Sequence, residues 1–436
     1  MNDQSPARSK ARNILSKLAA AAYLVFALAV GLFSVTKGLS YYYADQAKAG
    51  DSSAVSNALK FDVRNPEIYK IEGSKLLASE NYPEAAAALQ KAVELRDRDY
   101  LLHLRLGYAL YRSGDAEGAR QSYLRALALA PDYAQSNRYL GRLLLKLGET
   151  DQAFEYLGRA AALDSTLYGE VLHLARVNLP KADASENASA DLIEQKLKIE
   201  SFEGRKRAAQ YFIRHAMLNE ATKNFLFAGP LSGDEKRRFI NALVRYGHFR
   251  MARDLWLTVP ENKRLTDESA DTFIIDGGFE KTEASDESAV SWQIENRLRY
   301  VKAAIDERVR RSGSRSLYIS FKGPAEFKTN FISQIVPVES GRSYALEAAV
   351  KNSEIVSGGS LELVVIDPAT NEIIGKTGNF VMKESDWKIY RASFRAGDSA
   401  AVMIALRRAE CRANPCPIFA EIWLDDIALT ASVRTD

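Results

Sequence analysis

Residues 100–133 read YLLHLRLGYALYRSGDAEGARQSYLRALALAPDY, and the same pattern of small and apolar residues stands 34 residues before and 34 residues after this stretch. The positions that keep this step are Gly73, Gly107 and Gly141, then Ala85, Ala119 and Ala153, then Ala92, Ala126 and Ala160, and finally Leu95, Leu129 and Leu163. A fixed period of this length is typical of helical hairpins that stack on one another. The sequence therefore predicts three such units, at 66–99, 100–133 and 134–167.

Helix packing within each unit explains why these positions hold small residues. The glycines and the first set of alanines stand where the two helices of a hairpin approach most closely, and a larger side chain would push the helices apart. Pro131 ends the second unit, because proline cannot continue a helix. Together these residues resemble the tetratricopeptide repeat. The resemblance implies an α-helical solenoid whose inner groove binds a segment of another protein.

In that family, fixed positions of each first helix line the groove. Carried onto this chain, these positions hold Lys70, Ser74, Leu104, Tyr108, Tyr111, Arg112, Arg138, Arg142 and Lys146. The end of the groove in the third unit is basic and has two tyrosines beside it. This composition predicts capture of an acidic peptide segment or of a C-terminal carboxylate. The alternative is a solvated basic face, balanced by acids elsewhere or covered by the chain's own downstream helices.

The helical pattern continues on both sides of the three units. Upstream, SAVSNALKFDVRNP (53–66) resembles the second helix of a worn repeat, so we expect the array to begin near Tyr41. Downstream, TLYGEVLHLARVNL (166–179) predicts a helix that caps the last unit, which gives an array at 41–178. Residues 179–262 begin with a polar stretch and then return to helical spacing, which predicts further helical hairpins.

Residues 18–36 read LAAAAYLVFALAVGLFSVT and contain no charge. A helix of this length spans about 28 Å, close to the hydrocarbon thickness of a bilayer. Four basic residues precede it within 1–17, and the charges just after it cancel. The positive-inside rule then predicts a cytoplasmic tail at 1–17, a transmembrane helix at 18–36 and export of the rest.

A cleaved signal peptide and a buried core helix are the alternatives for this segment. We predict an uncleaved, single-pass anchor in the inner (cytoplasmic) membrane, because no small-residue cleavage site closely follows the apolar run. The bulk of the protein would then be periplasmic.

The formal net charge is +3, and residues 1–17 account for all of it. A neutral body argues against nucleic acid as a partner, since such binders use net basic domains to neutralise phosphates. The two cysteines, Cys411 and Cys416, stand in CRANPC. Their spacing suits a short-loop disulfide in an oxidising compartment, with a zinc site or a redox pair as the alternatives.

After Pro260 the apolar period changes to two, which is typical of strands. Apolar residues alternate with other residues in RSLYISF (315–321), YALEAAV (344–350) and VMIAL (402–406), and turn signals separate these runs. The pattern predicts an all-β sandwich at 270–432.

The order of landmarks in this region, from FIIDGGFE (273–280) through Trp292 to IFAEIWLDDIAL (418–429), resembles the carbohydrate-binding-module jelly roll of the galactose-binding-like superfamily. The resemblance implies sugar stacking on exposed aromatic faces, for which we predict Trp292 and Tyr318. It also implies a structural calcium site, whose oxygen ligands would come from Glu280 together with Asp425 or Asp426. The alternative for these three acids is a plain hydrogen-bonding role.

Sequence motifs of catalysis are missing: no G-x-S-x-G elbow, P-loop or dinucleotide fingerprint occurs. We therefore predict a non-enzymatic multidomain α + β protein with a transmembrane helix, a tetratricopeptide solenoid and an all-β jelly roll. Its predicted role is an extracytoplasmic scaffold that binds protein through the repeats and a polysaccharide through the sandwich, in assembly or export of a cell-surface polysaccharide. The alternatives are a purely structural envelope scaffold and a glycan-acting hydrolase.

Overall fold

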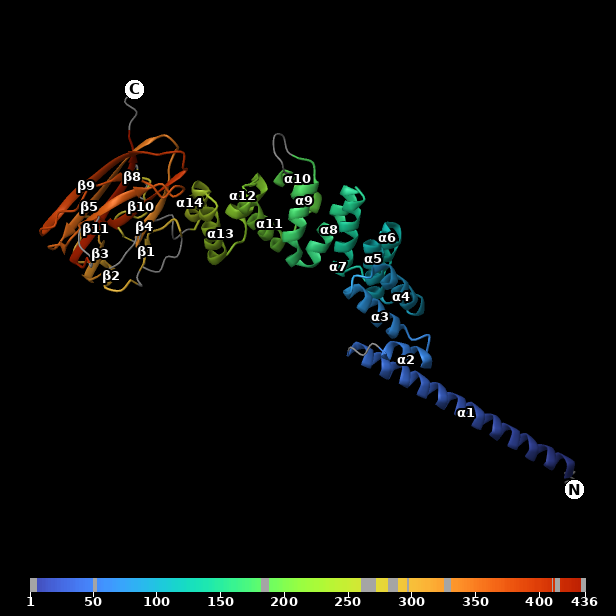
Figure 1. The fold of residues 1–436 in the computed structure, drawn as a ribbon. Coiled ribbons are helices and arrows are strands. Elements are labelled where there is room, and N and C mark those ends of the chain that lie inside the picture. The colour runs from blue at the N-terminus through green and yellow to red at the C-terminus, as the bar shows by residue number, and fades with distance from the viewer. Residues whose placement is uncertain are drawn as a thin grey trace, which may run out of the picture. The chain divides into compact units, whose positions relative to one another are not determined.

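The computed structural model of this chain describes residues 6–49, 53–181, 188–259, 272–280, 289–295, 298–324, 331–409, 411 and 416–432. The chain divides into two compact units, Met1–Arg207 and Ala208–Asp436. The first unit is helical, and the second combines helices with two β-sheets (Figure 1).

Consecutive helices of the first unit form antiparallel pairs, as the 34-residue period predicts. The helices are α1 (Pro6–Lys48), α2 (Ala54–Phe61), α3 (Pro66–Ala78), α4 (Tyr82–Leu95), α5 (Tyr100–Ser113), α6 (Ala116–Leu129), α7 (Ala134–Lys146), α8 (Thr150–Leu163), α9 (Tyr168–Asn178) and α10 (Ala190–Leu197). A 3₁₀ turn, η1 (Ser165–Leu167), precedes α9, and α11 (Phe202–Arg214) crosses the boundary between the units.

The three predicted hairpins are the pairs α3/α4, α5/α6 and α7/α8. Local side chains fix where these helices begin. The Asp99 carboxylate accepts hydrogen bonds from the first backbone N–H groups of α5, and Asp115 accepts one from Gly118 N in α6 at 2.9 Å. Such N-caps satisfy donors that a helix leaves without partners. Gly114 ends α5 in the left-handed conformation at φ +98°, which glycine adopts without strain.

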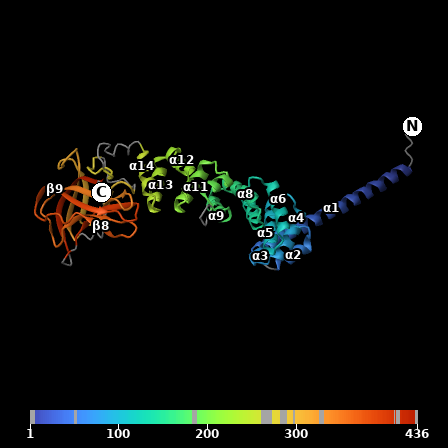
Figure 2. The same ribbon diagram turned by 90° about the horizontal axis from the view of Figure 1, so that it is seen from above.

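One continuous helix, α1, takes the place of the separate transmembrane helix and array start that the sequence predicts (Figure 2). Its apolar part, within Asn13–Lys48, is long and apolar enough to cross a membrane and is not buried against the rest of the protein. The last turns of α1, in contrast, are packed against the rest of the protein. Ser40, Ala44 and Ala47 are buried, and the two alanines pack in one cluster with residues of α2 and α3. The end of α1 therefore forms a further hairpin with α2.

In the second unit, three helices lie next to a β-sandwich. The helices are α12 (Glu220–Ala228), α13 (Gly233–Arg245) and α14 (Phe249–Leu257). The strands are β1 (Gln293–Ile294), β2 (Val301–Asp306), β3 (Ser316–Gly323), β4 (Ile332–Pro337), β5 (Ser343–Asn352), β6 (Val356–Ser357), β7 (Leu361–Ile366), β8 (Ile373–Lys376), β9 (Ser385–Arg395), β10 (Ala401–Arg408) and β11 (Ile418–Ala431). The helical region predicted at 179–262 is thus divided between the two units, and α12–α14 belong with the sandwich.

The strands form two antiparallel sheets that enclose one core. The order of the first sheet is β1-β4-β10-β7-β8, and that of the second is β2-β3-β11-β5-β9, with β6 paired to β11. The alternation predicted from the sequence is present, since Leu317, Ile319 and Phe321 of β3 all point into the core. The structure therefore confirms a β-rich C-terminal region with a sandwich arrangement.

Two neighbouring residues connect this core to the helices of the same unit. The side chain of Ile274 lies in the core of the sandwich, and that of Ile275 lies in the core formed by α11–α14. The buried side chain of Gln334 on β4 holds the backbone between them: it accepts from Ile275 N at 2.9 Å and donates to Ile275 O at 2.8 Å. The helices and the sandwich of the second unit are therefore joined through one buried segment.

Candidate functional site

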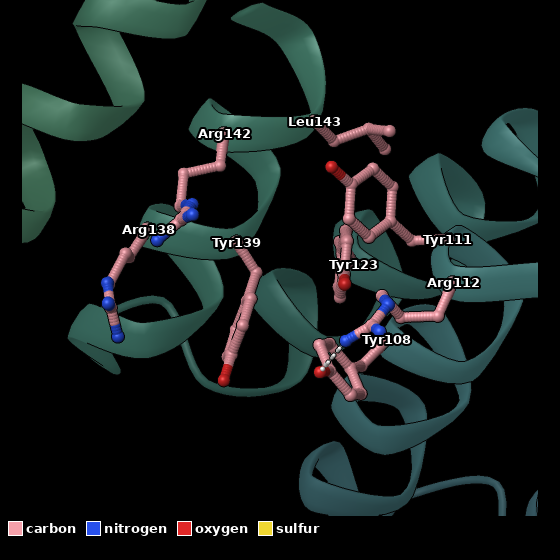
Figure 3. A pocket seen from close by; sticks show the side chains of 8 residues that line it. All are labelled: Tyr108, Tyr111, Arg112, Tyr123, Arg138, Tyr139, Arg142 and Leu143. Carbon is pink, nitrogen blue, oxygen red and sulfur yellow. Dashed lines mark hydrogen bonds between the residues drawn. The ribbon is translucent and has the colours of Figure 1, made fainter. Parts of the chain in front are cut away.

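A pocket of about 430 Å³ opens on the array between the second and third hairpins. Helix α5, helix α6 and helix α7 all contribute side chains to it (Figure 3). We call it the tyrosine pocket, and its lining residues are Tyr108, Tyr111, Arg112, Tyr123, Arg138, Tyr139, Arg142 and Leu143.

Tyrosine rings form the inner part of the pocket. Tyr139 stacks on Tyr123 with ring centroids 5.8 Å apart, and it also contacts Tyr108 at 5.9 Å. Tyr123 is 1% exposed, and its burial raises the pKa of its hydroxyl far above the ordinary value. The Tyr123 ring lies directly against Gly107, where a Cβ atom would be 2.6 Å from the ring. The small residue at this repeat position therefore makes the space that the tyrosine fills.

Cations flank the rings on one side. The Arg112 guanidinium donates to the Tyr108 hydroxyl at 2.7 Å and lies over the ring of Tyr82, 4.2 Å from its centroid. The Lys146 ammonium lies 4.8 Å from the centroid of the Tyr111 ring. Such contacts hold a cation against an aromatic face and leave its other donors available to a ligand.

On the other side, two arginines of α7 share one carboxylate. Arg138 Nη2 lies 2.7 Å from Glu170 Oε2, and Arg142 Nη1 lies 2.9 Å from Glu170 Oε1. Glu170 belongs to α9, the helix that follows the third hairpin. Part of the basic face is therefore neutralised by the downstream helix, which was one of the alternatives that the sequence left open.

The structure brings together five of the residues predicted for the groove: Tyr108, Tyr111, Arg112, Arg138 and Arg142. Lys146 contacts Tyr111 at the rim, whereas Leu104 is buried in the core of the array. Lys70 instead pairs with Glu67 on its own helix at 2.6 Å, and Ser74 accepts a hydrogen bond from Arg105 at 3.0 Å.

Three lining residues were missed by the sequence reasoning: Tyr123, Tyr139 and Leu143. Tyr123 comes from a second helix, and the family's groove positions were taken from first helices alone. A signal was present, because a large aromatic residue 16 positions after Gly107 marks the site where the hairpin is closely packed.

Trp292 requires a correction. The sequence predicts it as a glycan-stacking residue, but it is 2% exposed and lies in the sandwich core, 5.2 Å from the Phe279 ring. Its indole N–H donates to Asp276 O at 3.1 Å. No face of this ring is open to a sugar, because the packing of the core covers it.

Tyr318 lies on the outward face of the six-stranded sheet and is half-buried. Its hydroxyl donates to Glu421 Oε1 at 2.6 Å, and its ring lies 5.3 Å from that of Trp423 on the neighbouring strand β11. Trp423 donates to Asp306 Oδ2 at 2.9 Å. The face thus carries a pair of aromatic rings with two carboxylates beside them.

The three acids predicted for calcium are held by hydrogen bonds from residues 311–315. Glu280 Oε1 accepts from Ser314 N at 2.8 Å, and Asp425 Oδ2 accepts from Arg311 N at 2.8 Å. Asp426 pairs with the Arg311 guanidinium at 2.8 Å. Across the described residues, no group of three or more His, Cys, Asp or Glu side chains could hold a metal ion. The arrangement is that of the hydrogen-bonding alternative, and calcium binding stays a prediction.

Cys411 and Cys416 form a disulfide in the structure. Arg408 lies beside it and donates to Cys416 O at 2.5 Å and to Pro417 O at 3.0 Å. The bond closes a short loop just before β11, so its role here is structural.

Comparison with known proteins identifies the repeats. A model described as "Tetratricopeptide repeat" matches residues 72–134 and 119–167. The BBSome complex member BBS4 of Bos taurus is 29% identical over 117 residues, which cover 27% of this chain and 22% of that protein. The TPR repeat-containing thioredoxin TTL4 of Arabidopsis thaliana is 26% identical over 118 residues, covering 27% of this chain and 17% of that protein. The matched region thus spans about a fifth of the length of these curated relatives.

Solved structures of low identity also match part of this chain. A structure of the MamA protein is 20% identical, with a TM-score of 0.32, and the match covers 42% of this chain and 94% of that one. The Yersinia enterocolitica type III secretion chaperone SycD, solved with a peptide of the translocator YopD, is 21% identical, with a TM-score of 0.23, and the match covers 24% of this chain and 85% of that one. The identification rests on the family model and the period of the sequence: residues 72–167 of this chain are tetratricopeptide repeats.

Proposed function

We propose that this protein is a membrane-anchored scaffold that binds a peptide segment of a partner protein in the tyrosine pocket. Tetratricopeptide repeats imply a protein-binding scaffold. The observation that carries the proposal is the pocket itself, where tyrosine rings and arginine side chains converge from three helices. Aromatic residues and arginine are the side chains that dominate binding energies at protein interfaces.

Binding of random dodecapeptides displayed on phage to the full chain in detergent micelles tests this proposal. We expect enriched peptides whose affinity falls at least about tenfold in Arg112→Gln and in Tyr139→Ala, as expected for hot-spot residues. Arg159→Gln is the matched control, because Arg159 pairs with Glu155 on the exposed face of α8, outside the pocket. Equal affinity of the pocket variants and the wild type would refute the assignment of the site.

The anchor is part of the same proposal, and the buried end of α1 supports its retention. A signal peptidase acts after the apolar run, so cleavage would remove the preceding helix. Ser40 is fully buried and accepts a hydrogen bond from the buried Asn65 side chain at 3.0 Å. Cleavage after Ala49 would remove Ala44 and Ala47 and expose the apolar surface of α2 and α3 that they now cover.

The intact mass of the protein purified from its native membrane tests retention. We expect a mass that includes residues 18–36, together with resistance to extraction by alkaline carbonate. A mature chain that begins after residue 36 would contradict the anchor and leave the peptide site unaffected.

A second candidate function is glycan binding on the outward face of the six-stranded sheet. The observation that favours it is the aromatic pair Tyr318–Trp423 with the carboxylates of Glu421 and Asp306 beside it, since sugars stack on aromatic faces and are oriented by polar groups. Glycan binding on this face would agree with the predicted role in cell-surface polysaccharide assembly. A glycan array with the full chain tests it: Tyr318→Ala should lose the signal, and Lys376→Ala, on the other sheet, should keep it.

A further inference from the structure

The carboxylate of Glu170 occupies a defined position at the edge of the tyrosine pocket. Each of its oxygens is paired with a different arginine of α7, at 2.7 Å to Arg138 and 2.9 Å to Arg142. Figure 3 shows the two arginine side chains on one side of Tyr139 and Arg112 on the other. Arg138 also lies over the Tyr139 ring, 5.9 Å from its centroid, so the carboxylate is paired with a residue that contacts the stacked rings.

The pairing is accessible to solvent and can be exchanged. The side chain of Glu170 is 28% exposed and that of Arg142 is 52% exposed. Arg138 is 25% exposed, so its pair with Glu170 is partly accessible to solvent. Solvent-accessible ion pairs contribute about 0–1 kcal/mol each, because water and salt screen them. Helix α9 does not depend on them for its docking, since Tyr168, Val171, Leu172 and Ala175 on the same helix are buried. Glu170 can therefore leave the arginines while α9 stays in place.

The charges around the pocket remain unbalanced with Glu170 in position. Arg112, Arg138, Arg142 and Lys146 supply four cations, and Glu170 supplies one carboxylate. Within the described part of the chain, Arg112 and Lys146 contact aromatic rings and form no ion pair. In addition, the buried Nε of Arg138 has no hydrogen-bond acceptor among the described residues. An anionic ligand would meet Arg112 and Lys146, the two cations that Glu170 does not pair with.

We propose that Glu170 marks the position of a partner's carboxylate, so that the pocket recognises an acidic peptide segment whose carboxylate displaces Glu170 from Arg138 and Arg142. This inference rests on the proposed peptide-binding function and names the ligand class of the same site. An aromatic or aliphatic side chain next to that carboxylate packs against Tyr139 and Tyr108. Arg112 and Lys146 receive a second acidic group.

The need to displace Glu170 lowers the apparent affinity of the pocket for its ligand. A ligand that needs the arginines binds only the fraction of molecules in which Glu170 has left them, and its apparent affinity is reduced by that fraction. Removing the charge of Glu170 removes this competition. Glu170→Gln should therefore bind acidic peptides about two- to tenfold more tightly than the wild type, which corresponds to the strength of two exposed ion pairs.

The experiment uses the full chain in detergent micelles and the random dodecapeptide display library, followed by fluorescence titration of the enriched sequences. We expect enrichment of Asp or Glu next to an aromatic or aliphatic residue. Amide replacement of that acid should weaken binding to the wild type at least about tenfold, and Arg138→Gln/Arg142→Gln should lose it, as for charge-assisted contacts. Glu155→Gln is the control, because Glu155 forms an ion pair with Arg159 on α8 that does not adjoin the pocket.

Glu170→Asp separates competition from a structural role. Its carboxylate is one methylene farther from the arginines while the charge is kept, so it should also bind more tightly than the wild type, by a smaller factor than Glu170→Gln. A purely structural role of Glu170 predicts weaker peptide binding and a lower midpoint of thermal unfolding in both variants, and that result would overturn the inference.

The outcomes also separate the inference from the proposed function. The inference is overturned if the enriched peptides are neutral, or if millimolar inorganic phosphate rather than peptide carboxylates competes for the site. Either result leaves the pocket as a binding site. Failure of the wild type to enrich any peptide overturns the proposed function and the inference together.

Discussion

Tyr123 serves both the core of the array and the tyrosine pocket. Its ring fills the space beside Gly107 and stacks on Tyr139. The packing inside one hairpin therefore fixes the position of a ring that lines the tyrosine pocket. A change that moves this ring should affect stability and ligand binding together, because the interior is closely packed and does not deform freely.

Gly107→Ala tests this coupling. The added Cβ would lie 2.6 Å from two carbons of the Tyr123 ring, which must shift. We expect a loss of about 1–3 kcal/mol in the free energy of unfolding, as for other overpacked sites, and weaker peptide binding. Gly169→Ala in α9 is the control, since nothing lies within 4 Å of its added Cβ. Chemical denaturation measures both variants, and equal stabilities would show that Tyr123 adapts without cost.

Glu67 of α3 pairs with three cations: Lys48 of α1 at 3.1 Å, Lys70 of its own helix at 2.6 Å, and Arg96 just after α4 at 3.6 Å. The Lys48 contact joins the hairpin of α1 and α2 to the first repeat. Burial by itself raises the pKa of this carboxyl, but the hydrogen bonds from Lys70 and Lys48 outweigh burial, and the net pKa is lowered. A carboxylate with a lowered pKa contributes stability above its unfolded pKa, about 4.3, and loses it as the pH falls through the folded value.

Glu67→Gln should therefore be less stable than the wild type at pH 7, by about 1 kcal/mol after allowing for solvent screening. The difference should shrink below about pH 4, where the wild-type carboxyl is itself protonated. Chemical denaturation at pH 7, 5 and 3.5 measures this trend. Glu94→Gln serves as the control, because Glu94 is exposed and accepts a hydrogen bond from the neighbouring Gln90. A difference that grows on acidification would contradict the role assigned to Glu67.

At the scale of elements, α1 combines two environments in one helix. Its apolar part has no protein around it, whereas Ala44 and Ala47 near its end are each 1% exposed and pack against the next two helices. Tyr43 on the same turn stacks on Phe61 of α2, with ring centroids 5.7 Å apart. Small residues at this end permit the close approach of α2, as they do in the repeats.

Ala47→Asp should unfold the hairpin of α1 and α2, because it buries a charge in a cluster of apolar side chains. Gln46→Asp, one residue earlier and exposed, should leave the hairpin intact. Limited proteolysis of the full chain in detergent, with mass analysis of the fragments, should show cleavage near residues 50–65 in Ala47→Asp alone. Equal protection of both variants would show that the end of α1 is not part of the array.

At the scale of the whole molecule, the second unit depends on the segment that passes between its two cores. Ile274 and Ile275 direct neighbouring side chains into the sandwich and into the helices. Gln334 satisfies both backbone groups of Ile275, and Asn241 of α13 accepts from Ala289 N at 3.0 Å. The helices α12–α14 and the sandwich should therefore lose protection together.

Gln334→Leu leaves the N–H and C=O groups of Ile275 without these partners in a buried place. We expect a loss of about 2–4 kcal/mol in the free energy of unfolding, from two unsatisfied groups. Hydrogen exchange followed by mass spectrometry should show faster exchange in both α14 and β4. In the control variant Lys376→Gln, on the exposed edge strand β8, the exchange rates of α14 and β4 should both stay as in the wild type. Faster exchange confined to β4 would show that the two cores unfold separately.

The sequence alone determined the helical repeats and the β-rich C-terminal region, because burial in helices and strands repeats with the period of the element. The 34-residue step of Gly73, Gly107 and Gly141 predicted the hairpins, and alternation in β3 predicted which side chains enter the core. The tertiary structure decided the site. Tyr123 meets Tyr139, Glu170 meets Arg138, and Trp292 is buried under Phe279, and each of these contacts depends on the packing of elements that no local period encodes.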